Sequence, residues 1–367
     1  MIAASGALAP VPLTAGAVLH PLVLPARAGA GPSPLHDYAD ARNRGLTEST
    51  GRDDDHLTPA QLLPLLATDA YQRRRQWRIL REDRTVGVAV LNISLDAGGE
   101  SAIVFISVLR EVQGRGIGTA VAHHLEALAR TDGVRTLRVW AEHPASDDPT
   151  IAAPTGFGRV PRDHTARFLE AQGWTLEQID RVSAYPAGSD RHLRSLNADA
   201  TAAAADYEVV QWMLPTPDQH RAGYAWMKSR MSTDAPDAGM ETPEEIWDEE
   251  RVRANDARWA AMGSTVQVTA ARHRASGELA AFSELEHRGS PDAPTHQQDT
   301  LVLAAHRGHR LGLLVKTTGM LSWRERYPHS GEIITYNAEE NRPMLSINEE
   351  LGFAAIAYEG AWKKTLA

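Results

Sequence analysis

Three glycines stand within five positions in the first half of the chain. Gly114, Gly116 and Gly118 belong to the segment VLREVQGRGIGTAVAHHLEALAR, which covers residues 108–130. Glycine lets the backbone come close to a ligand and adopt dihedral angles that other residues avoid. If a helix begins here, its unpaired N–H groups and its dipole add a partial positive charge. The segment therefore predicts an anion site suited to a phosphate or pyrophosphate.

The residues on either side of the glycines predict the elements that hold them. Residues 101–109, SAIVFISVL, are β-branched and apolar, which is typical of a buried strand. Ile117, Val121 and Leu125 recur at helical spacing, and Gly133 supplies a stop signal. We expect a strand, a glycine-rich loop and a helix, in that order.

The glycine spacing distinguishes between the phosphate loops that proteins use. A Walker loop ends in Gly-Lys-Ser/Thr, whereas Gly118 is followed directly by Thr119. The dinucleotide fingerprint needs a further glycine three positions after Gly118, where Val121 stands. The pattern that remains is Gln-x-x-Gly-x-Gly, formed by Gln113, Gly116 and Gly118. A tight turn between a strand and a helix is the alternative explanation.

This pattern resembles the acyl-CoA loop of the GNAT (Gcn5-related N-acetyltransferase) superfamily. Residues 136–140, TLRVW, predict a second strand, and residues 166–174, ARFLEAQGW, resemble the closing helix and Gly-aromatic turn of a GNAT domain. The order of these elements indicates the GNAT superfamily much more specifically than the loop alone does. The resemblance implies that the cofactor is bound by Val108, Leu109, Gln113, Gly114, Arg115, Gly116, Ile117, Gly118 and Thr119.

The second half of the chain repeats the plan. Residues 299–323 again predict a strand, a turn and a helix, and residues 332–337, EIITYN, predict the next strand. Residues 341–353, NRPMLSINEELGF, resemble the closing helix and turn. Gly118 and Gly312 are 194 residues apart. Two copies of one α/β unit explain the length of 367 residues better than two unrelated domains.

The repeat extends upstream of each loop. TPAQL at Thr58 and TPEEI at Thr242 each place a capping threonine, a proline at the first helical position and Gln or Glu at the third. Candidate hairpins follow at residues 77–93 and 266–285. We expect a linker near residues 184–208, which are rich in Ala, Ser and Asp.

The resemblance covers nearly the whole chain and implies an α/β fold with a mixed sheet in two tandem GNAT acyltransferase domains. The architecture is similar to that of two-domain actinobacterial acetyltransferases of the mycothiol synthase type. We expect an N-terminal domain at residues 1–195 and a C-terminal domain at residues 196–367.

The two copies differ at positions that bear on the cofactor. In the second copy the resemblance implies that the cofactor is bound by Arg307, Gly308, Arg310, Gly312 and Asn341. Arg310 stands where the middle glycine belongs, so its guanidinium either pairs with a phosphate or fills the pocket. Asn341 fits the place of an asparagine that contacts the pantetheine arm in this family. The complete loop favours the first copy as the main acyl-CoA site.

The resemblance implies direct transfer, in which a neutral amine attacks the thioester. A backbone N–H at Val108 is expected to stabilise the oxyanion. Many GNAT enzymes use a tyrosine in the last helix as the acid, but Leu169 and Asn348 stand there. Our candidates for proton handling are Glu142 and Tyr336, each at the end of a strand beside the cleft. A solvated carboxylate and a half-buried strand tyrosine are the alternatives.

Composition limits the partners. The net charge of −9 argues against a nucleic-acid backbone, and the absence of cysteine fits the cytoplasm and excludes thiolate metal sites. The apolar first residues lack a basic region and contain prolines, so we expect neither a signal peptide nor a membrane span. We expect no metal, and a monomer or homodimer.

These observations predict an acyl-CoA-dependent N-acyltransferase. Acetyl-CoA, or another acyl-CoA, is the expected co-substrate. A primary amine of a small molecule is the expected acceptor, and specialised metabolism is the expected setting. The alternative is a degenerate tandem module that binds acyl-CoA or a metabolite without turnover.

Overall fold

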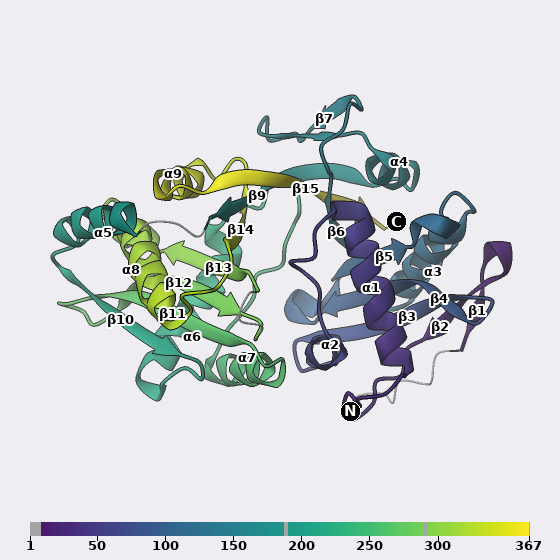
Figure 1. The fold of residues 1–367 in the computed structure, drawn as a ribbon, viewed down its shortest axis with the longest axis horizontal. Helices are drawn as coiled ribbons and strands as arrows, with labels where there is room; N and C mark the ends of the chain where they lie inside the picture. Colours follow the sequence, from purple (N-terminus) through teal and green to yellow (C-terminus); the bar gives the residue numbers. More distant parts are fainter. Residues whose placement is uncertain (1–8, 187–189, 290–292, 367) are drawn as a thin grey trace. The chain divides into compact units, whose positions relative to one another are not determined.

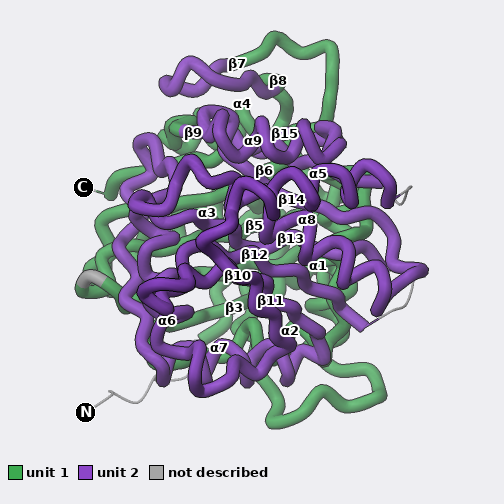
Figure 2. Tube along the Cα trace, turned by 90° about the vertical axis from the view of Figure 1, so that its left-hand side faces the viewer, with its two compact units in different colours: residues 1–151, 161–177, 360–367 green, residues 152–160, 178–359 purple. Residues whose placement is uncertain are grey.

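The computed structural model describes residues 9–186, 190–289 and 293–366. The chain divides into two compact units (Figure 2). Unit 1 comprises residues 1–151, 161–177 and 360–367, and unit 2 comprises residues 152–160 and 178–359. The expected domains, residues 1–195 and 196–367, stay a prediction. Within the described residues, no helix is long and apolar enough to cross a membrane.

Unit 1 carries the first copy of the repeat (Figure 1). Its strands lie in the order β1-β2-β3-β4-β5-β6, and the end of β15 lies beside β6. Neighbouring strands are antiparallel apart from the parallel pair β5 and β6. The elements are β1 (Val11–Pro12), β2 (Ala17–Pro21), α1 (Pro34–Thr50), α2 (Pro59–Leu66), β3 (Gln72–Arg81), β4 (Arg84–Ser94), β5 (Ser101–Val108), α3 (Ile117–Thr131), β6 (Thr136–Glu142) and α4 (His164–Ala171).

The strands of unit 2 repeat this arrangement in the order β9-β14-β13-β12-β11-β10, with β13 and β14 as the parallel pair. Strands β7 (Thr150–Ala152), β8 (Arg159–Pro161), β9 (Thr175–Tyr185) and β15 (Ala354–Thr365) have residues in both units. The other elements are α5 (Arg191–Ala203), β10 (Tyr207–Met213), α6 (Asp218–Asp234), α7 (Glu249–Ala261), β11 (Thr265–His273), β12 (Leu279–His287), β13 (Thr295–Val302), α8 (Leu311–Arg326), β14 (Ile333–Ala338) and α9 (Arg342–Leu351).

The parallel pair of each unit separates along its length. The ladder between β5 and β6 runs from Ser101 to Ile103 on β5, whereas that strand continues to Val108. The ladder between β13 and β14 covers only Thr295 and His296 on β13. Beyond these ladders the two parallel strands of each unit are no longer paired with each other, and the unpaired part lies toward the loop of that copy. The strand expected before the glycine loop is confirmed, and it separates from β6 after Ile103.

Helices cover both faces of the unit 2 sheet (Figure 1). On one face, α5 and α8 bury Leu193, Leu314 and Trp323 against the sheet. On the other face, α6 and α7 bury Tyr224 and Val252. Strand residues alternate between the two cores because successive side chains of a strand point to opposite faces. Because α8, the helix that follows the loop, packs on one of these buried faces, its position relative to the sheet is fixed.

The expected linker at 184–208 is corrected by the structure. Residues 191–203 form α5, whose Leu193, Leu196 and Ala200 are buried in the core of unit 2. These apolar residues recur at helical spacing, and the surrounding Ala, Ser and Asp residues hide that pattern. The segment is a structural part of the second unit.

The two expected helix starts have different outcomes. Thr58 and Gln61 form the predicted capping box, and Pro59 stands between them at the start of the helix. The start predicted at Thr242 is wrong, since α7 begins at Glu249 with Asp248 as its cap.

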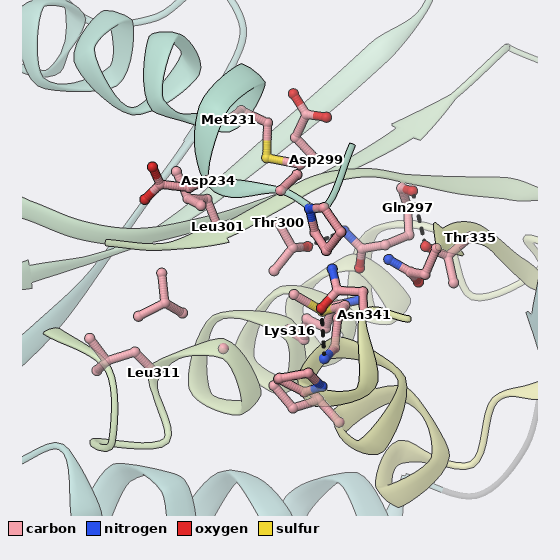
Figure 3. Close-up of a pocket in the computed structure, with 18 of the residues that line it drawn as sticks. Met231, Asp234, Gln297, Asp299, Thr300, Leu301, Leu311, Lys316, Thr335 and Asn341 are labelled. Carbon is pink, nitrogen blue, oxygen red and sulfur yellow. Dashed lines mark hydrogen bonds between the residues drawn. The ribbon is translucent and has the colours of Figure 1, made fainter. Parts of the chain in front are cut away.

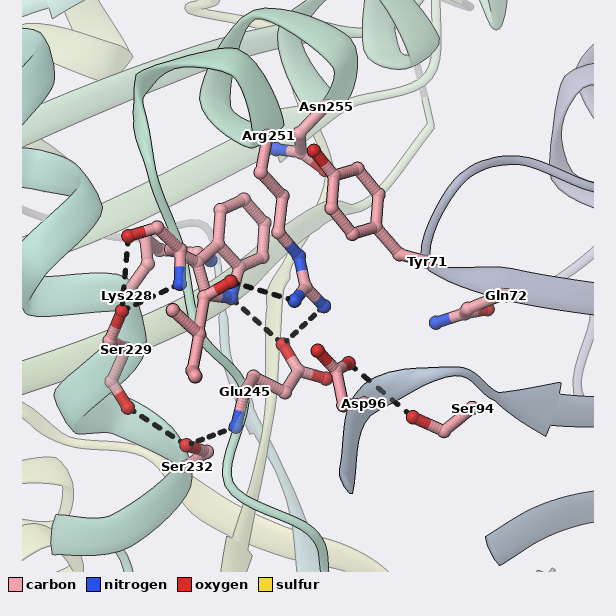
Figure 4. Close-up of polar contacts among 12 residues, drawn as sticks. Tyr71, Gln72, Ser94, Asp96, Lys228, Ser229, Ser232, Glu245, Arg251 and Asn255 are labelled. Atoms are coloured by element: carbon pink, nitrogen blue, oxygen red, sulfur yellow. Dashed lines mark hydrogen bonds and ion pairs between the residues drawn. The ribbon is translucent and has the colours of Figure 1, made fainter. Parts of the chain in front are cut away.

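The reason for this difference lies in contacts with α6 (Figure 4). Ser232 Oγ accepts a hydrogen bond from the Glu245 N–H at 3.0 Å, and Ser229 Oγ accepts one from the Trp247 N–H at 2.7 Å. Arg251 then pairs with the Glu245 carboxylate at 3.2 Å. These bonds hold the segment outside any helix or strand, so its local capping signal is not used.

Candidate active site

Unit 2 contains a pocket of about 580 Å³ beside the loop that precedes α8 (Figure 3). The splayed strands β13 and β14, the loop itself, the end of α6 and the start of α9 form its walls. Its lining residues include Asp234, Gln297, Asp299, Thr300, Val302, Arg307, Gly308, Arg310, Leu311, Gly312, Lys316, Tyr336, Asn337, Glu340 and Asn341. All five residues of the second copy that were expected to bind the cofactor line this pocket.

Arg310 adopts the left-handed conformation of a loop glycine, with φ of 55°. Its guanidinium pairs with Glu350 at 2.5 Å on the closing helix. Arg307 donates from Nε to the Val302 carbonyl at 3.3 Å and approaches Asp234 at 3.8 Å. The two arginines thus place positive charge around the N-terminus of α8.

The loop of the first copy has the same backbone. Gln113 donates from Nε2 to the Val108 carbonyl at 2.7 Å, and Gly116 has φ of 77° at the N-cap of α3. Gly114 also has a positive φ, of 71°. The hydroxyl of Thr14 donates to the Arg115 carbonyl at 3.3 Å, so the N-terminal hairpin lies against this loop.

The other expected loop residues have mixed surroundings. Leu109 and Ile117 are buried in the core, so only their backbone groups are available to a ligand. The Leu109 N–H is already bonded to the Val86 carbonyl at 2.9 Å. The hydroxyl of Thr119 lies 3.5 Å from Gln172 Nε2.

The last glycine of each loop receives a side chain of the closing helix. A Cβ on Gly118 would lie 3.5 Å from the Phe168 ring, and a Cβ on Gly312 would lie 2.9 Å from Ile347 Cδ1. Neither glycine has a positive φ. The small size of Gly312 therefore permits the packing of α9, whereas a Cβ at Gly118 would make an ordinary contact with Phe168.

The side chain of Asn341 caps α9 by accepting a hydrogen bond from the Met344 N–H at 3.4 Å. Its place in the pocket wall is next to the start of α9 (Figure 3). Arg162, which falls there in the first copy, instead pairs with Glu170 at 2.7 Å.

Lys316 was missed by the sequence analysis. This residue of α8 lines the pocket and is 1% exposed. Its Nζ donates a hydrogen bond to Asn348 Oδ1 at 2.8 Å. Burial lowers the pKa of the Lys316 ammonium from 10.5 to about 7. A comparison of the copies at the 194-residue offset would have found it, since Ala122 stands at that position in the first copy.

The two candidates for proton handling lie in different units. Tyr336 lines the unit 2 pocket and is 37% exposed. Glu142, in unit 1, pairs with Arg52 at 2.8 Å. Burial raises the pKa of Glu142 to about 7 against the opposing charge of Arg52, and nearby Asp54 and Asp55 raise it further. Glu142 therefore has a pKa suited to proton transfer, but is held by an arginine.

Acidic side chains add to the pocket wall. Asp299 is ion-paired with Lys228, which also approaches Glu284 at 3.4 Å. Glu340 accepts a hydrogen bond from Gln178 at 2.8 Å, while its Oε2 is buried without a partner. Across the described ranges, no group of three or more His, Cys, Asp or Glu side chains is arranged to hold a metal ion.

The comparisons with known proteins agree with this geometry. The Acetyltransferase (GNAT) family matches residues 42–154, which include the first splayed strand, its loop and α3. Residues 42–154 therefore form a GNAT domain. A search of curated protein sequences finds no match.

Solved structures extend the GNAT fold to the whole chain. A tandem GNAT protein from the clavulanic acid biosynthesis pathway superposes with a TM-score of 0.72 at 22% identity, covering 95% of this chain and 98% of that one. A GCN5-related N-acetyltransferase from Sphaerobacter thermophilus gives 0.58 at 16% identity, covering 94% and 97%. The chain thus has the mixed α/β fold of a tandem GNAT protein.

Proposed function

We propose that this tandem GNAT protein is an acyl-CoA-dependent N-acyltransferase whose acyl-CoA site is the unit 2 pocket. One observation carries the proposal. A single pocket is lined by the loop at a helix N-terminus, by Asn341 and by acidic side chains. This assignment departs from the preference for the first copy, because the second loop, Asn341 and the acidic side chains line one cavity.

The loop supplies what a diphosphate needs. The first N–H groups of α8 have no partner within the helix, and the helix dipole adds partial positive charge. Arg307 and Arg310 bring two guanidinium groups to the same end, where Arg310 is paired with Glu350 and Arg307 approaches Asp234. The amide of Asn341 suits the polar pantetheine arm, and the unpaired edge of β13 beyond His296 offers N–H groups to a thioester oxygen.

The acidic wall suits an amine acceptor. Asp234, Asp299 and Glu340 line the pocket, and the unpartnered Oε2 of Glu340 can accept a hydrogen bond from an ammonium group. Asp234 and Asp299 are already paired with Arg230 and Lys228, so Glu340 is the acidic group that an ammonium would contact directly. We therefore propose a primary amine of a small molecule as acceptor and acetyl-CoA, or a related acyl-CoA, as donor.

A matched pair of variants tests this function. Asn341→Ser removes the amide but keeps a capping oxygen for α9, whereas Arg162→Ser changes the equivalent position of the first copy. Titration calorimetry should show acetyl-CoA binding several-fold weaker for Asn341→Ser, since one hydrogen bond contributes about 1 kcal/mol. Arg162→Ser should bind like the unchanged protein.

Turnover separates the enzyme from a binding module. Thiol release from acetyl-CoA is measured with a panel of primary amines. Release above the rate without amine supports the transferase, whereas binding without release for every amine supports the module without turnover. No binding of acetyl-CoA by the unchanged protein would contradict both.

A further inference from the structure

Lys316 is a cation with little around it to balance its charge. It is buried on α8, and in the described part of the chain its hydrogen bond is to Asn348 and no carboxylate pairs with it. Burying an unpaired charge is costly, so such a residue is rarely kept for packing alone. Its position in the wall of the proposed acyl-CoA pocket suggests a chemical role.

Two neighbours hold the Lys316 side chain in place. Asn348 is 1% exposed and donates from Nδ2 to Asn337 Oδ1 at 2.7 Å, so its Oδ1 is turned toward Lys316. The Phe353 ring lies on the other side, with its centroid 5.6 Å from Nζ. One N–H of the ammonium is used by Asn348, which leaves others for a group in the pocket.

The Lys316 ammonium is acidic enough to protonate a thiolate. Its pKa of about 7 lies below the value of about 8.5 for a free thiol, so transfer of a proton from the ammonium to a thiolate is downhill. Near neutral pH a large fraction of the side chain still carries the proton. The other charged groups that line the pocket are Asp234, Asp299, Arg307, Arg310 and Glu340.

We propose that Lys316 Nζ is the proton donor to the departing CoA thiolate in unit 2, an inference that rests on the proposed function. The neutral amine forms a C–N bond to the thioester carbonyl carbon, and the C–S bond breaks with its electron pair going to sulfur. Lys316 gives one proton to that sulfur. The amine loses its surplus proton to a carboxylate or to water, and Lys316 recovers a proton from solvent.

The comparison of the two copies supports a specific role. Ala122 stands at the equivalent position of the first copy, and Leu169 stands where the second copy has Asn348. Both members of the Lys316–Asn348 pair are therefore absent from the first copy. We infer that only unit 2 can supply this proton.

The test replaces Lys316 in the full chain. Lys316→Met removes the proton donor with a similar shape, and Lys316→Gln keeps a hydrogen bond to Asn348 without an acidic proton. Each should lower kcat for acetyl-CoA with the best amine by about 10²-fold or more. Calorimetric binding of acetyl-CoA should stay within about twofold. Lys363→Met, on the last strand of unit 1, is the matched control and should keep its kcat.

Varying the acidity of the leaving thiol distinguishes a proton donor from a residue that has only a structural role. An acyl thioester of a more acidic thiol needs no acid, so its aminolysis should be nearly equal in Lys316→Gln and the unchanged protein. Equal kcat with acetyl-CoA in a folded Lys316→Gln would overturn the proposal, as would acetylation of Lys316 itself on a catalytic timescale by mass spectrometry. Either result leaves amine-dependent thiol release intact in the unchanged protein, whereas failure of the proposed function would mean that the unchanged protein releases no thiol with any amine.

Discussion

Arg307 in the second copy repeats the hydrogen bond that Gln113 makes in the first. Each side chain reaches back five residues to the carbonyl at the end of the splayed strand, at 3.3 Å to Val302 and 2.7 Å to Val108. Two different residue types therefore fix the same turn. This shared bond, with the shared left-handed position at Gly116 and Arg310, holds both loops in one conformation.

The glycines of the first loop should respond differently to alanine. Gly118→Ala should be neutral or stabilise by about 0.5–1 kcal/mol, because its Cβ meets the Phe168 ring at an ordinary 3.5 Å. Gly116→Ala should destabilise by about 1–2 kcal/mol, since its φ is 77°. Thermal unfolding of both variants checks the order. A lower melting temperature for Gly118→Ala than for Gly116→Ala would contradict this account.

Glu142 should make stability depend on pH. Its folded pKa of about 7 exceeds the ordinary 4.5, so the folded state binds a proton more tightly than the unfolded state. Stability should therefore fall as pH rises from about 4.5 to about 7 and then level off. Thermal unfolding at pH 5 and 7.5 measures this fall, which should be smaller in Glu142→Gln. An equal fall in both proteins would refute the assignment to Glu142.

The last residues of the chain should stabilise unit 1. Trp362 is 1% exposed, and its Nε1 donates to His143 Nε2 at 3.3 Å. His143 in turn lies 3.1 Å from Asp163. Trp362→Ala should destabilise the protein by about 3–5 kcal/mol. The loss should appear as faster hydrogen exchange in unit 1. By the same reasoning, a fragment of residues 1–195 should be less stable than that fragment joined to residues 360–367.

The Asp299 carboxylate should strengthen binding of the amine acceptor and have little effect on binding of acetyl-CoA, the acyl donor. Asp299→Asn removes one negative charge from the pocket wall, so KM for a cationic amine should rise about tenfold, which corresponds to about 1.4 kcal/mol. Binding of acetyl-CoA should change little. Asp148→Asn, which removes a carboxylate paired with Arg167 in unit 1, is the control. An unchanged KM in Asp299→Asn would argue for an acceptor that binds elsewhere.

Much of the fold follows from local pattern. The strand at 101–109, the helix after it and the closing helices were predictable because apolar residues recur with the periods of strands and helices. The repeat at an offset of 194 residues then predicted the corresponding elements of the second copy. The cap at Thr242 failed because Ser229 and Ser232, distant in sequence, bind that segment.

The chemistry of the pocket was harder to predict. The low pKa of Lys316 depends on burial, which no local pattern reports. The pairing of Glu142 with Arg52 joins residues 90 positions apart. The role of Gly312 in helix packing could be recognised only from the position of Ile347. Each of these facts comes from tertiary contacts between segments that are far apart in the chain.

Gly308 and Gly114 offer the most direct test of which loop binds acyl-CoA. They are equivalent in the two copies, both have positive φ, and a Cβ at either would meet open space. An aspartate at each position therefore adds one negative charge under matched conditions. Calorimetry should show acetyl-CoA binding at least about tenfold weaker for Gly308→Asp and nearly unchanged for Gly114→Asp. Weaker binding for Gly114→Asp alone, or for neither variant, would contradict the assignment of the acyl-CoA site to unit 2.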